Sequence, residues 1–340
     1  MKQPKLGFAA YALALVCAWT PATSTGAEPA DNAVFDLQGH RGARGLRPEN
    51  TLAAFTRALE LGVRTLELDC TVTRDGVVVV SHDSSLNPDI TRDAGEKFLE
   101  AAGPPLYALT YTELQRYDVG RLRPGSDYSA RLPDQLAVDG ERIPRLADVY
   151  ALVQRSGNRD VRFNIETKLD PLQPELTAAP EPFVKSLIAV IRDSGMETRT
   201  TIQSFDWRTL ALVRQLGPGI ATVALTDQQP GEDTMEVGKP GASPWLGGLD
   251  VDDYGGSVPK AVKAIGAAVW SPHMLDLDAR VVAEAHALGI AVIPWTVNDP
   301  KDMVRLLALG VDGMISDRPD LLRAVLQAKG IAVPSPTPMR

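Results

Sequence analysis

A helix-like stretch that ends at a glycine and is followed almost at once by an apolar, β-branched run recurs seven times along the chain. Glycine adopts left-handed backbone conformations without steric cost, so it is common where helices end. The apolar runs are short and rich in Val, Ile and Thr, which is typical of buried strands. Each junction therefore predicts the end of a helix and the start of a strand. The seven glycines are Gly62, Gly157, Gly195, Gly217, Gly266, Gly289 and Gly310.

One more apolar strand, residues 34–39, precedes the first junction and brings the expected number of strands to eight. Strands that alternate with helices form a parallel sheet covered by those helices. Eight such units close into a (β/α)8 barrel, the TIM barrel, which we predict as a single domain over residues 33–330. A doubly wound open sheet is the alternative, because repetition alone does not prove closure. The last helix, residues 319–329, is expected to seal the barrel, and the Pro-rich tail 331–340 to be disordered.

The interval between Gly62 and Gly157 is 95 residues, much longer than the 21 to 49 residues between the later junctions. It begins with a β-hairpin, residues 71–80, whose turn is at Asp75-Gly76. The remainder, about residues 84–160, is a small insertion after the second barrel strand. In a TIM barrel such an insertion lies over the C-terminal mouth and shapes the pocket.

The N-terminus has the pattern of a secretory signal peptide. Lys2 and Lys5 precede an apolar stretch, residues 6–19, that is too short to span a bilayer, and small residues follow up to Ala27. We therefore expect residues 1–27 to be removed and the protein to be exported, with the periplasm favoured because no surface anchor is evident. Cys70 is then the only cysteine that remains, so no internal disulfide can form.

The composition is that of a soluble globular protein, since 44% of the 340 residues are hydrophobic and 23% are charged. The formal net charge is −8 and there is no basic run, which excludes nucleic acid as a partner. The same negative charge argues against lasting attachment to anionic lipid, so we expect no stable membrane insertion. The expected partner is a small molecule, and the oligomeric state is left open.

Acidic residues close two neighbouring strands of the predicted barrel. Glu67 and Asp69 are two residues apart and project to one face, as do Glu166 and Lys168 on the next barrel strand. Three carboxylates that converge on one lumen are costly unless cations pair with them or a metal ion lies among them. Oxygen ligands favour a hard divalent ion, Ca²⁺ or Mg²⁺, over zinc.

Two histidines follow apolar runs beside this acidic group. Imidazole titrates near neutral pH, so His40 and His82 can serve as general base and general acid. With Arg41 and Lys168 as phosphate ligands, the set suits a phosphodiester and the extra negative charge of its transition state. Trp295, which ends the seventh strand, is either a wall of the substrate pocket or a packing residue.

The ordered set of motifs resembles the glycerophosphodiester phosphodiesterase family, and the likeness spans almost the whole chain after the signal peptide. No single motif is decisive, but their order and their places at strand ends are specific. The motifs are His40-Arg41-Gly42, Pro48-Glu49-Asn50-Thr51, Glu67-x-Asp69, His82-Asp83, Glu166-x-Lys168, Gln203-Ser204-Phe205, Trp295-Thr296-Val297-Asn298 and Ser316-Asp317-Arg318-Pro319.

The resemblance implies a TIM barrel that hydrolyses glycerophosphodiesters to sn-glycerol 3-phosphate and an alcohol. It implies that the glycerol 2-hydroxyl attacks phosphorus to give a cyclic phosphate, which water then opens. Which histidine acts first as the base stays open. The implied roles are one divalent cation, Ca²⁺ or Mg²⁺, held by Glu67, Asp69 and Glu166, acid-base catalysis by His40 and His82, and phosphate binding by Arg41 and Lys168.

The chain departs from the family pattern directly after His82-Asp83, where an additional Asn87-Pro88-Asp89 segment precedes Thr91-Arg92. This puts the substrate preference in question. One alternative is a phospholipase D or C acting on intact lipid, which would need an exposed apolar rim around the mouth. Another is a barrel that binds a phosphorylated ligand without catalysis, but all five histidine and acidic positions are filled.

Overall fold

The computed structural model describes residue 1 and residues 34–339. The expected signal peptide, apart from Met1, lies outside the described residues. Within the described part, no helix is both long and apolar enough to cross a membrane.

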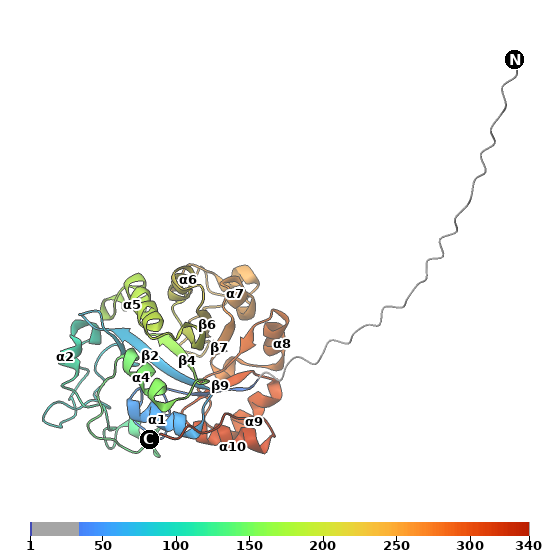
Figure 1. The fold of residues 1–340 in the computed structure, drawn as a ribbon. Helices are drawn as coiled ribbons and strands as arrows, with labels where there is room; N and C mark the ends of the chain where they lie inside the picture. Colours follow the sequence, from blue (N-terminus) through green and yellow to red (C-terminus); the bar gives the residue numbers. More distant parts are fainter. Residues whose placement is uncertain (2–33, 340) are drawn as a thin grey trace. The chain divides into compact units, whose positions relative to one another are not determined.

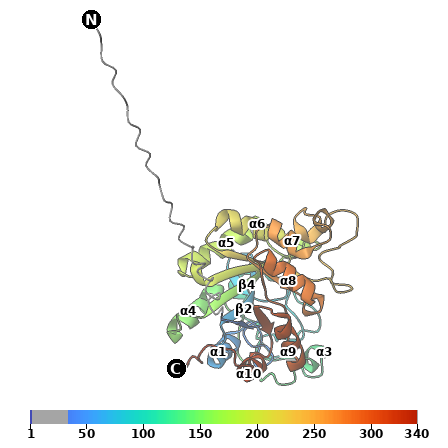
Figure 2. The ribbon, with the colours of Figure 1, turned by 90° about the vertical axis from the view of Figure 1, so that its right-hand side faces the viewer.

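Eight parallel strands form the centre of the molecule, and helices surround them (Figures 1 and 2). The strands follow one another in the order β8-β7-β6-β5-β4-β2-β1-β9. Backbone hydrogen bonds from Asp312 to Val292 (2.9 Å) and from Ile315 to Pro294 (3.0 Å) bring β9 against β8 and nearly close the barrel. The predicted barrel is confirmed, and the open sheet is wrong. The barrel strands are β1 (Asp36–Gly39), β2 (Thr65–Val72), β4 (Arg162–Thr167), β5 (Thr200–Ser204), β6 (Ala221–Thr226), β7 (Val269–Pro272), β8 (Ala291–Val292) and β9 (Gly313–Ser316).

The outer layer is made of the helices that connect these strands and of the C-terminal helix that follows the last strand (Figure 2). Each buries an apolar face against the barrel, as expected for amphipathic helices on a parallel sheet. They are α1 (Leu52–Leu61), α4 (Leu146–Ser156), α5 (Pro180–Asp193), α6 (Trp207–Leu216), α7 (Val258–Ala264), α8 (Ala279–Ala287), α9 (Pro300–Leu309) and α10 (Pro319–Ala328). Short helices in loops are α2 (Tyr111–Leu114), α3 (Asp127–Ala130), η1 (Leu106–Ala108), η2 (Pro174–Leu176), η3 (Glu197–Arg199), η4 (Pro244–Leu246), η5 (Val251–Tyr254) and η6 (Met274–Asp276).

Six of the seven junction glycines have the left-handed conformation that the sequence pattern implied. Gly62 is typical, with φ of 75° and an amide that donates to the carbonyls of Ala58 and Leu59 at the end of α1. Gly217 differs, with φ of −137°, although its amide still donates to the Val213 carbonyl. The same local device therefore ends most of the helices and turns the chain into the next strand.

The alternation along β2 separates the core from the site. Leu66, Leu68 and Cys70 pack in the apolar core, while Glu67 and Asp69 project to the other side of the strand. Cys70 is a packed thiol, and burial raises its pKa well above the usual range. One strand thus contributes to both the core and the lumen of the barrel.

The segment after β2 begins with the expected hairpin, because β3 (Val78–Val80) pairs antiparallel with β2. The insertion that follows has a small apolar cluster of its own. It ends near residue 145 rather than 160, because α4 packs between α1 and α5 in the outer layer. The cluster consists of Val79, Leu86, Leu106, Leu114, Val119 and Ile143.

The C-terminal tail differs from the expectation of disorder. Residues 331–339 pack against the N-terminal end of the barrel, where the Thr337 amide donates to the Leu59 carbonyl (2.9 Å). The Thr337 hydroxyl also accepts a hydrogen bond from the Asn158 side chain (2.7 Å). Composition predicts that a Pro-rich segment forms no structure alone, but it does not reveal the groove beside α1 in which this one lies.

Candidate active site

Three carboxylates meet at the carboxyl ends of β2 and β4. Asp69 lies opposite Glu166 in the parallel register, and Glu67 is two residues before Asp69 on the same face. Their ligand oxygens all lie within 4.8 Å of one another, and all three side chains are buried. The structure therefore brings together the acidic residues that the sequence pattern singled out.

The pKa values of the three carboxyl groups shift in different directions. Burial and the neighbouring Asp69 charge raise the pKa of Glu67 well above its usual range. Burial also raises the pKa of Glu166, to about 7, even though Lys168 opposes the shift. Burial would raise the pKa of Asp69 too, but the surrounding positive charges, Arg41 and Lys168 among them, outweigh it and lower that pKa.

The hydrogen bonds of this group leave room for a cation. Glu67 accepts from the Arg41 amide (2.8 Å) and from the Gln203 side chain (2.8 Å). Oδ1 of Asp69 is buried and has no hydrogen-bond partner. A buried carboxylate oxygen without a donor is costly, and hard divalent ions prefer carboxylate oxygens as ligands. These residues therefore fit Ca²⁺ or Mg²⁺.

A second group of potential ligands, Asp227, His273 and Asp276, also brings its atoms within 4.8 Å of one another in the described part of the chain. Asp276 already accepts from the Gln228 amide (3.1 Å) and the Gln229 side chain (2.5 Å). Gln229 also donates its amide to Asp227 (2.7 Å). Protein donors therefore reach both of these carboxylates, whereas Oδ1 of Asp69 has no donor.

His40 follows β1 on a tight turn. A Cβ atom on Gly39 would lie 2.0 Å from the Gly42 carbonyl oxygen, so only glycine fits there. Nδ1 of His40 donates to Oδ1 of Asp317 (2.5 Å), and Nε2 lies 4.0 Å from Glu67. Burial and the nearby Arg44 lower the pKa of His40 to about 4, against the opposing effect of Asp317. The ring is therefore neutral at pH 7, with Nε2 free to accept a proton.

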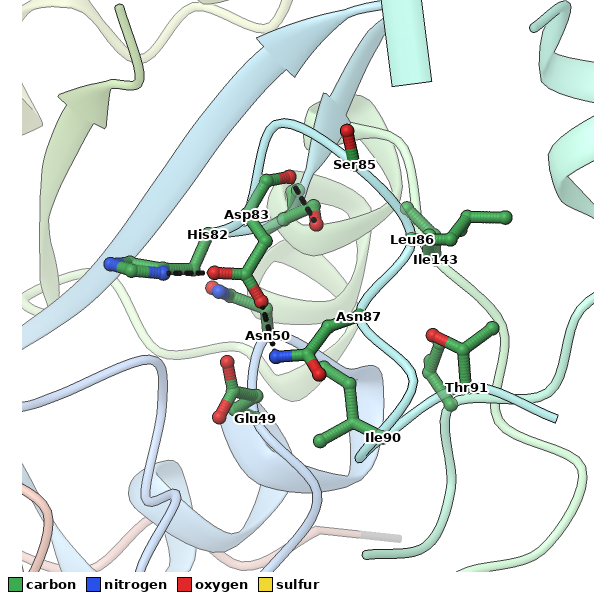
Figure 3. A pocket seen from close by; sticks show the side chains of 13 residues that line it. Glu49, Asn50, His82, Asp83, Ser85, Leu86, Asn87, Ile90, Thr91 and Ile143 are labelled. Atoms are coloured by element: carbon green, nitrogen blue, oxygen red, sulfur yellow. Dashed lines mark hydrogen bonds and ion pairs between the residues drawn. The ribbon is translucent and has the colours of Figure 1, made fainter. Parts of the chain in front are cut away.

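His82 is held from the other side of the mouth. Figure 3 shows its ring pointing away from Leu86 and Ile143, with Nδ1 directed at Asp83. Nδ1 donates to Oδ1 of Asp83 (2.9 Å), whose Oδ2 accepts from the Asn87 side chain (2.7 Å). These two hydrogen bonds orient the ring through Nδ1 and do not involve Nε2. The additional Asn87 segment thus supports the catalytic candidate it follows.

Positive charge reaches the carboxylates from two directions. Nζ of Lys168 lies 2.6 Å from Glu166 and 3.9 Å from Asp69. Arg41 pairs with Glu49 (2.7 Å) and approaches Asp69 (3.4 Å), and its Nε is buried without a hydrogen-bond partner. Both cations therefore lie beside the carboxylates and line a cavity there, and their binding of phosphate stays a prediction.

Two adjoining cavities open beside these residues. The smaller, about 160 Å³, is lined by His40, Arg41 and Trp295 among others. The larger, about 400 Å³, extends outward past Asp83 and Trp245. Trp295 is thus a wall of the pocket, and its indole N–H donates to the Ser271 carbonyl (3.0 Å). The residues that line both cavities are His82, Glu166, Lys168 and Phe205.

Several site residues were not assigned a role from the sequence. Asp317 binds both His40 and Arg44, the latter at 2.6 Å. Asn50 donates to Asp69 (2.9 Å) from a backbone with φ of 56°. Asn50 and Asp317 do lie in motifs quoted above, but their partners are far away along the chain. Their presence in strand-end motifs was the signal that could have identified them.

Comparisons with known proteins agree with this geometry. Residues 40–321 match the Glycerophosphoryl diester phosphodiesterase family. The chain is 30% identical over 292 residues to a glycerophosphodiester phosphodiesterase of Caldanaerobacter subterraneus subsp. tengcongensis, covering 86% of this chain and 97% of the relative. A crystal structure from Silicibacter pomeroyi superposes with a TM-score of 0.79 at 36% identity, covering 89% of this chain and 96% of the other. An Oleispira antarctica phosphodiesterase, solved with its product sn-glycerol-3-phosphate, shares the fold at 21% identity and a TM-score of 0.63, over 85% of this chain and 96% of that one.

Proposed function

The chain belongs to the glycerophosphoryl diester phosphodiesterase family and is a glycerophosphodiester phosphodiesterase, and from this premise we propose how it performs the hydrolysis. A divalent cation would be held by Glu67, Asp69 and Glu166, and His40 and His82 would form the acid-base pair. The observation that carries the proposal is the buried Asp69 oxygen without a hydrogen-bond donor, beside two histidines whose Nδ1 atoms are both held by carboxylates. Such an arrangement suits proton transfer on both sides of a phosphodiester.

The cavities support different roles for the two histidines in proton transfer. His40 lines only the smaller cavity, whereas His82 lines both. We place the glycerol phosphate portion in the smaller cavity and the leaving alcohol toward the larger one. Neutral His40 then accepts the proton of the glycerol 2-hydroxyl as its oxygen bonds to phosphorus. The bond from phosphorus to the alcohol oxygen breaks, and His82, which enters this step as the imidazolium held by Asp83, gives that oxygen the proton of Nε2 and becomes neutral.

Hydrolysis of the resulting cyclic phosphate uses the same two groups in reverse. His82 accepts a proton from water as the water oxygen bonds to phosphorus, and His40 returns its proton to the glycerol 2-oxygen as the ring opens. Arg41 and Lys168 bind phosphate oxygens throughout. The bound cation contributes Lewis-acid stabilisation of the negative charge that develops on phosphorus-bound oxygen. The products are sn-glycerol 3-phosphate and the free alcohol.

The test is release of glycerol 3-phosphate from glycerophosphocholine by the purified protein. We expect release that EDTA abolishes and that added Ca²⁺ or Mg²⁺ restores. His82→Ala should lose about 10²- to 10⁴-fold in turnover, the usual contribution of a general acid or base. His286→Ala is the matched control, because His286 is exposed and pairs with Asp312 outside the cavities. Full activity in EDTA would contradict the metal site, and full activity of His82→Ala would contradict the acid-base role.

We also propose that the protein is exported, with the periplasm as its destination. The support is the sequence pattern of Lys2, Lys5 and the apolar residues 6–19. Expression of the full chain in a Gram-negative host, followed by fractionation and N-terminal sequencing, tests this. We expect periplasmic protein that begins at Glu28, whereas cytoplasmic protein that retains Met1 would refute export.

A further inference from the structure

The larger cavity lies on the far side of the proposed phosphate position from the glycerol portion. At their junction the two cavities share the lining residues His82, Glu166, Lys168 and Phe205. The larger cavity has a volume of about 400 Å³. If phosphorus lies at this junction, as the proposed function requires, the group in the larger cavity is the alcohol that leaves. The lining of this cavity therefore bears on which alcohol the enzyme accepts.

Two aromatic rings form a corner in the wall of this cavity. Phe205 and Trp245 have ring centroids 6.4 Å apart and planes at 75°. Trp245 lies on η4, whose N-cap Ser243 is buried and donates its hydroxyl to the Thr234 carbonyl (2.7 Å). The pair is T-shaped, with the edge of one ring directed toward the face of the other, and both rings line the cavity. Aromatic faces carry negative π charge and attract quaternary ammonium groups.

Carboxylates supplement the rings. Asp83 and Asp170 both line the cavity, and hydrogen bonds from His82 and Asn87 help lower the pKa of Asp83 to about 2 against the effect of burial. Asp170 is oriented by the Leu172 amide (2.7 Å) and the Gln173 side chain (3.0 Å).

The positive charges lie at one end of the cavity. Among the described residues of its lining, the basic side chains are His82 and Lys168, and both lie at the junction. Lys168 is moreover paired there with Glu166 (2.6 Å). Beyond the junction the charged lining residues are Asp83 and Asp170, so the outer cavity has a negative character.

We propose that the larger cavity is the subsite for the leaving alcohol and that it selects alcohols carrying a quaternary ammonium group. The cation lies against Phe205 and Trp245 and is attracted by Asp170 and Asp83. The selectivity of the hydrolysis is thus set by the loops after β4, β5 and β6 and by the segment after β3, while the glycerol phosphate end is common to all substrates.

The experiment compares two substrates of nearly the same shape, glycerophosphocholine and its neutral carbon isostere, the glycerophosphodiester of 3,3-dimethylbutanol. Both are assayed with the metal-loaded enzyme through release of glycerol 3-phosphate. We expect kcat/KM to favour the choline ester about tenfold, the middle of the range for a partly desolvated cation on aromatic rings. The preference should appear mainly in KM, because the chemical step is the same for both substrates.

Variants locate the source of the preference. Trp245→Leu and Asp170→Asn should each lower the ratio of the two kcat/KM values toward one, mainly through loss of the choline ester. Glu175→Gln is the matched control for Asp170→Asn, because Glu175 is exposed on the same loop and does not line the cavity. Its ratio should equal that of the parent enzyme. Residual turnover of the neutral ester reports that each variant is folded.

The outcomes separate the two levels of the argument. Equal kcat/KM for both esters in an active parent enzyme would overturn the subsite while the proposed function stands. A preference that survives both Trp245→Leu and Asp170→Asn would likewise overturn it. If neither ester releases glycerol 3-phosphate, the proposed function fails and the subsite with it.

Discussion

Two groups of charged residues in this enzyme differ in how completely their buried carboxylates are hydrogen-bonded. In the insertion, Asp118 accepts hydrogen bonds from the amides of Gly120 (2.7 Å) and Gly140 (2.9 Å) and from Arg92 (2.6 Å). Burial opposes ionisation of Asp118, but these donors outweigh it and lower its pKa. Arg92 in turn also binds Asp139 (2.7 Å). Here the protein itself stabilises the ionised carboxylate.

The group at the mouth of the barrel lacks this balance. Glu67 and Glu166 have raised pKa values, and Oδ1 of Asp69 has no donor. A network that only holds the fold is expected to satisfy its own carboxylates, because each unsatisfied buried group costs stability. Nε of Arg92 in the insertion also lacks a hydrogen-bond partner, so the difference lies in the carboxylates. The comparison indicates that a buried carboxylate oxygen without a donor, rather than burial of charge, marks the site that fits a cation.

The largest expected effect is the loss of catalytic activity when a carboxylate at the mouth of the barrel is replaced. Glu166→Gln keeps the shape of the side chain and an acceptor for Lys168 but removes one metal-binding charge. We expect kcat/KM to fall roughly a thousandfold, because a bound cation supplies several kcal/mol of transition-state stabilisation. In EDTA the variant should be at least as stable as the parent, since a carboxylate of raised pKa opposes folding when ionised. Steady-state kinetics and urea unfolding in EDTA measure the two effects. A marked loss of stability without loss of activity would show that Glu166 serves the fold rather than the reaction.

The insertion should show the opposite result. Asp118→Ala leaves Arg92 with one carboxylate fewer and two amides without an acceptor, so we expect a loss of about 3 kcal/mol in unfolding free energy. Activity per folded molecule should change far less than in Glu166→Gln. Urea unfolding, together with activity at denaturant concentrations below the transition, checks this. A stability equal to that of the parent enzyme would show that the ion pairs are dispensable.

Metal binding should raise the thermal stability of the protein through the carboxylates at the mouth of the barrel, and not through the ion pairs of the insertion. A ligand at 100 times its Kd adds about 2.7 kcal/mol to the native state, so Ca²⁺ or Mg²⁺ should raise Tm above its value in EDTA. Thermal unfolding of the parent, Asp118→Ala and Glu166→Gln with and without the ion measures the shift. We expect the same increase in Asp118→Ala as in the parent and a smaller one in Glu166→Gln. Equal shifts in all three would place the ion elsewhere.

The smallest expected effect lies at the opposite end of the barrel, where the pairing is neutral. Thr337→Val removes the acceptor for Asn158 but keeps the backbone bond to Leu59, and should cost about 1 kcal/mol. Chemical denaturation of this variant and of Thr337→Ser provides the measurement. Thr337→Ser keeps the hydroxyl, so its loss should be smaller than that of Thr337→Val.

Local rules made much of this protein predictable. The left-handed glycines at helix ends and the apolar runs after them follow from backbone sterics and strand burial, which act within a few residues. The period of two along β2 likewise places Glu67 and Asp69 together on the face opposite Cys70. The barrel and its acidic lumen could therefore be predicted without coordinates.

Other features depend on residues that are distant along the chain. Asp317 holds His40 across 277 positions, and Asn50, which has a left-handed backbone, donates to Asp69 from another element of the fold. The docking of Thr337 beside α1 also has no local signal, since a Pro-rich segment is ordered only by the surface it meets.

The sequence by itself determined the order of strands and helices, the face on which each acid lies and the set of groups available for chemistry. Only the tertiary structure decided which oxygen of Asp69 stays without a donor, which carboxylate orients each histidine, and that Trp245 and Phe205 meet at a second cavity. The physical reason is the distance along the chain between the residues that interact. Helix ends and strand faces are set by interactions between near neighbours, whereas pairing, burial and cavity shape arise when distant segments exclude water together.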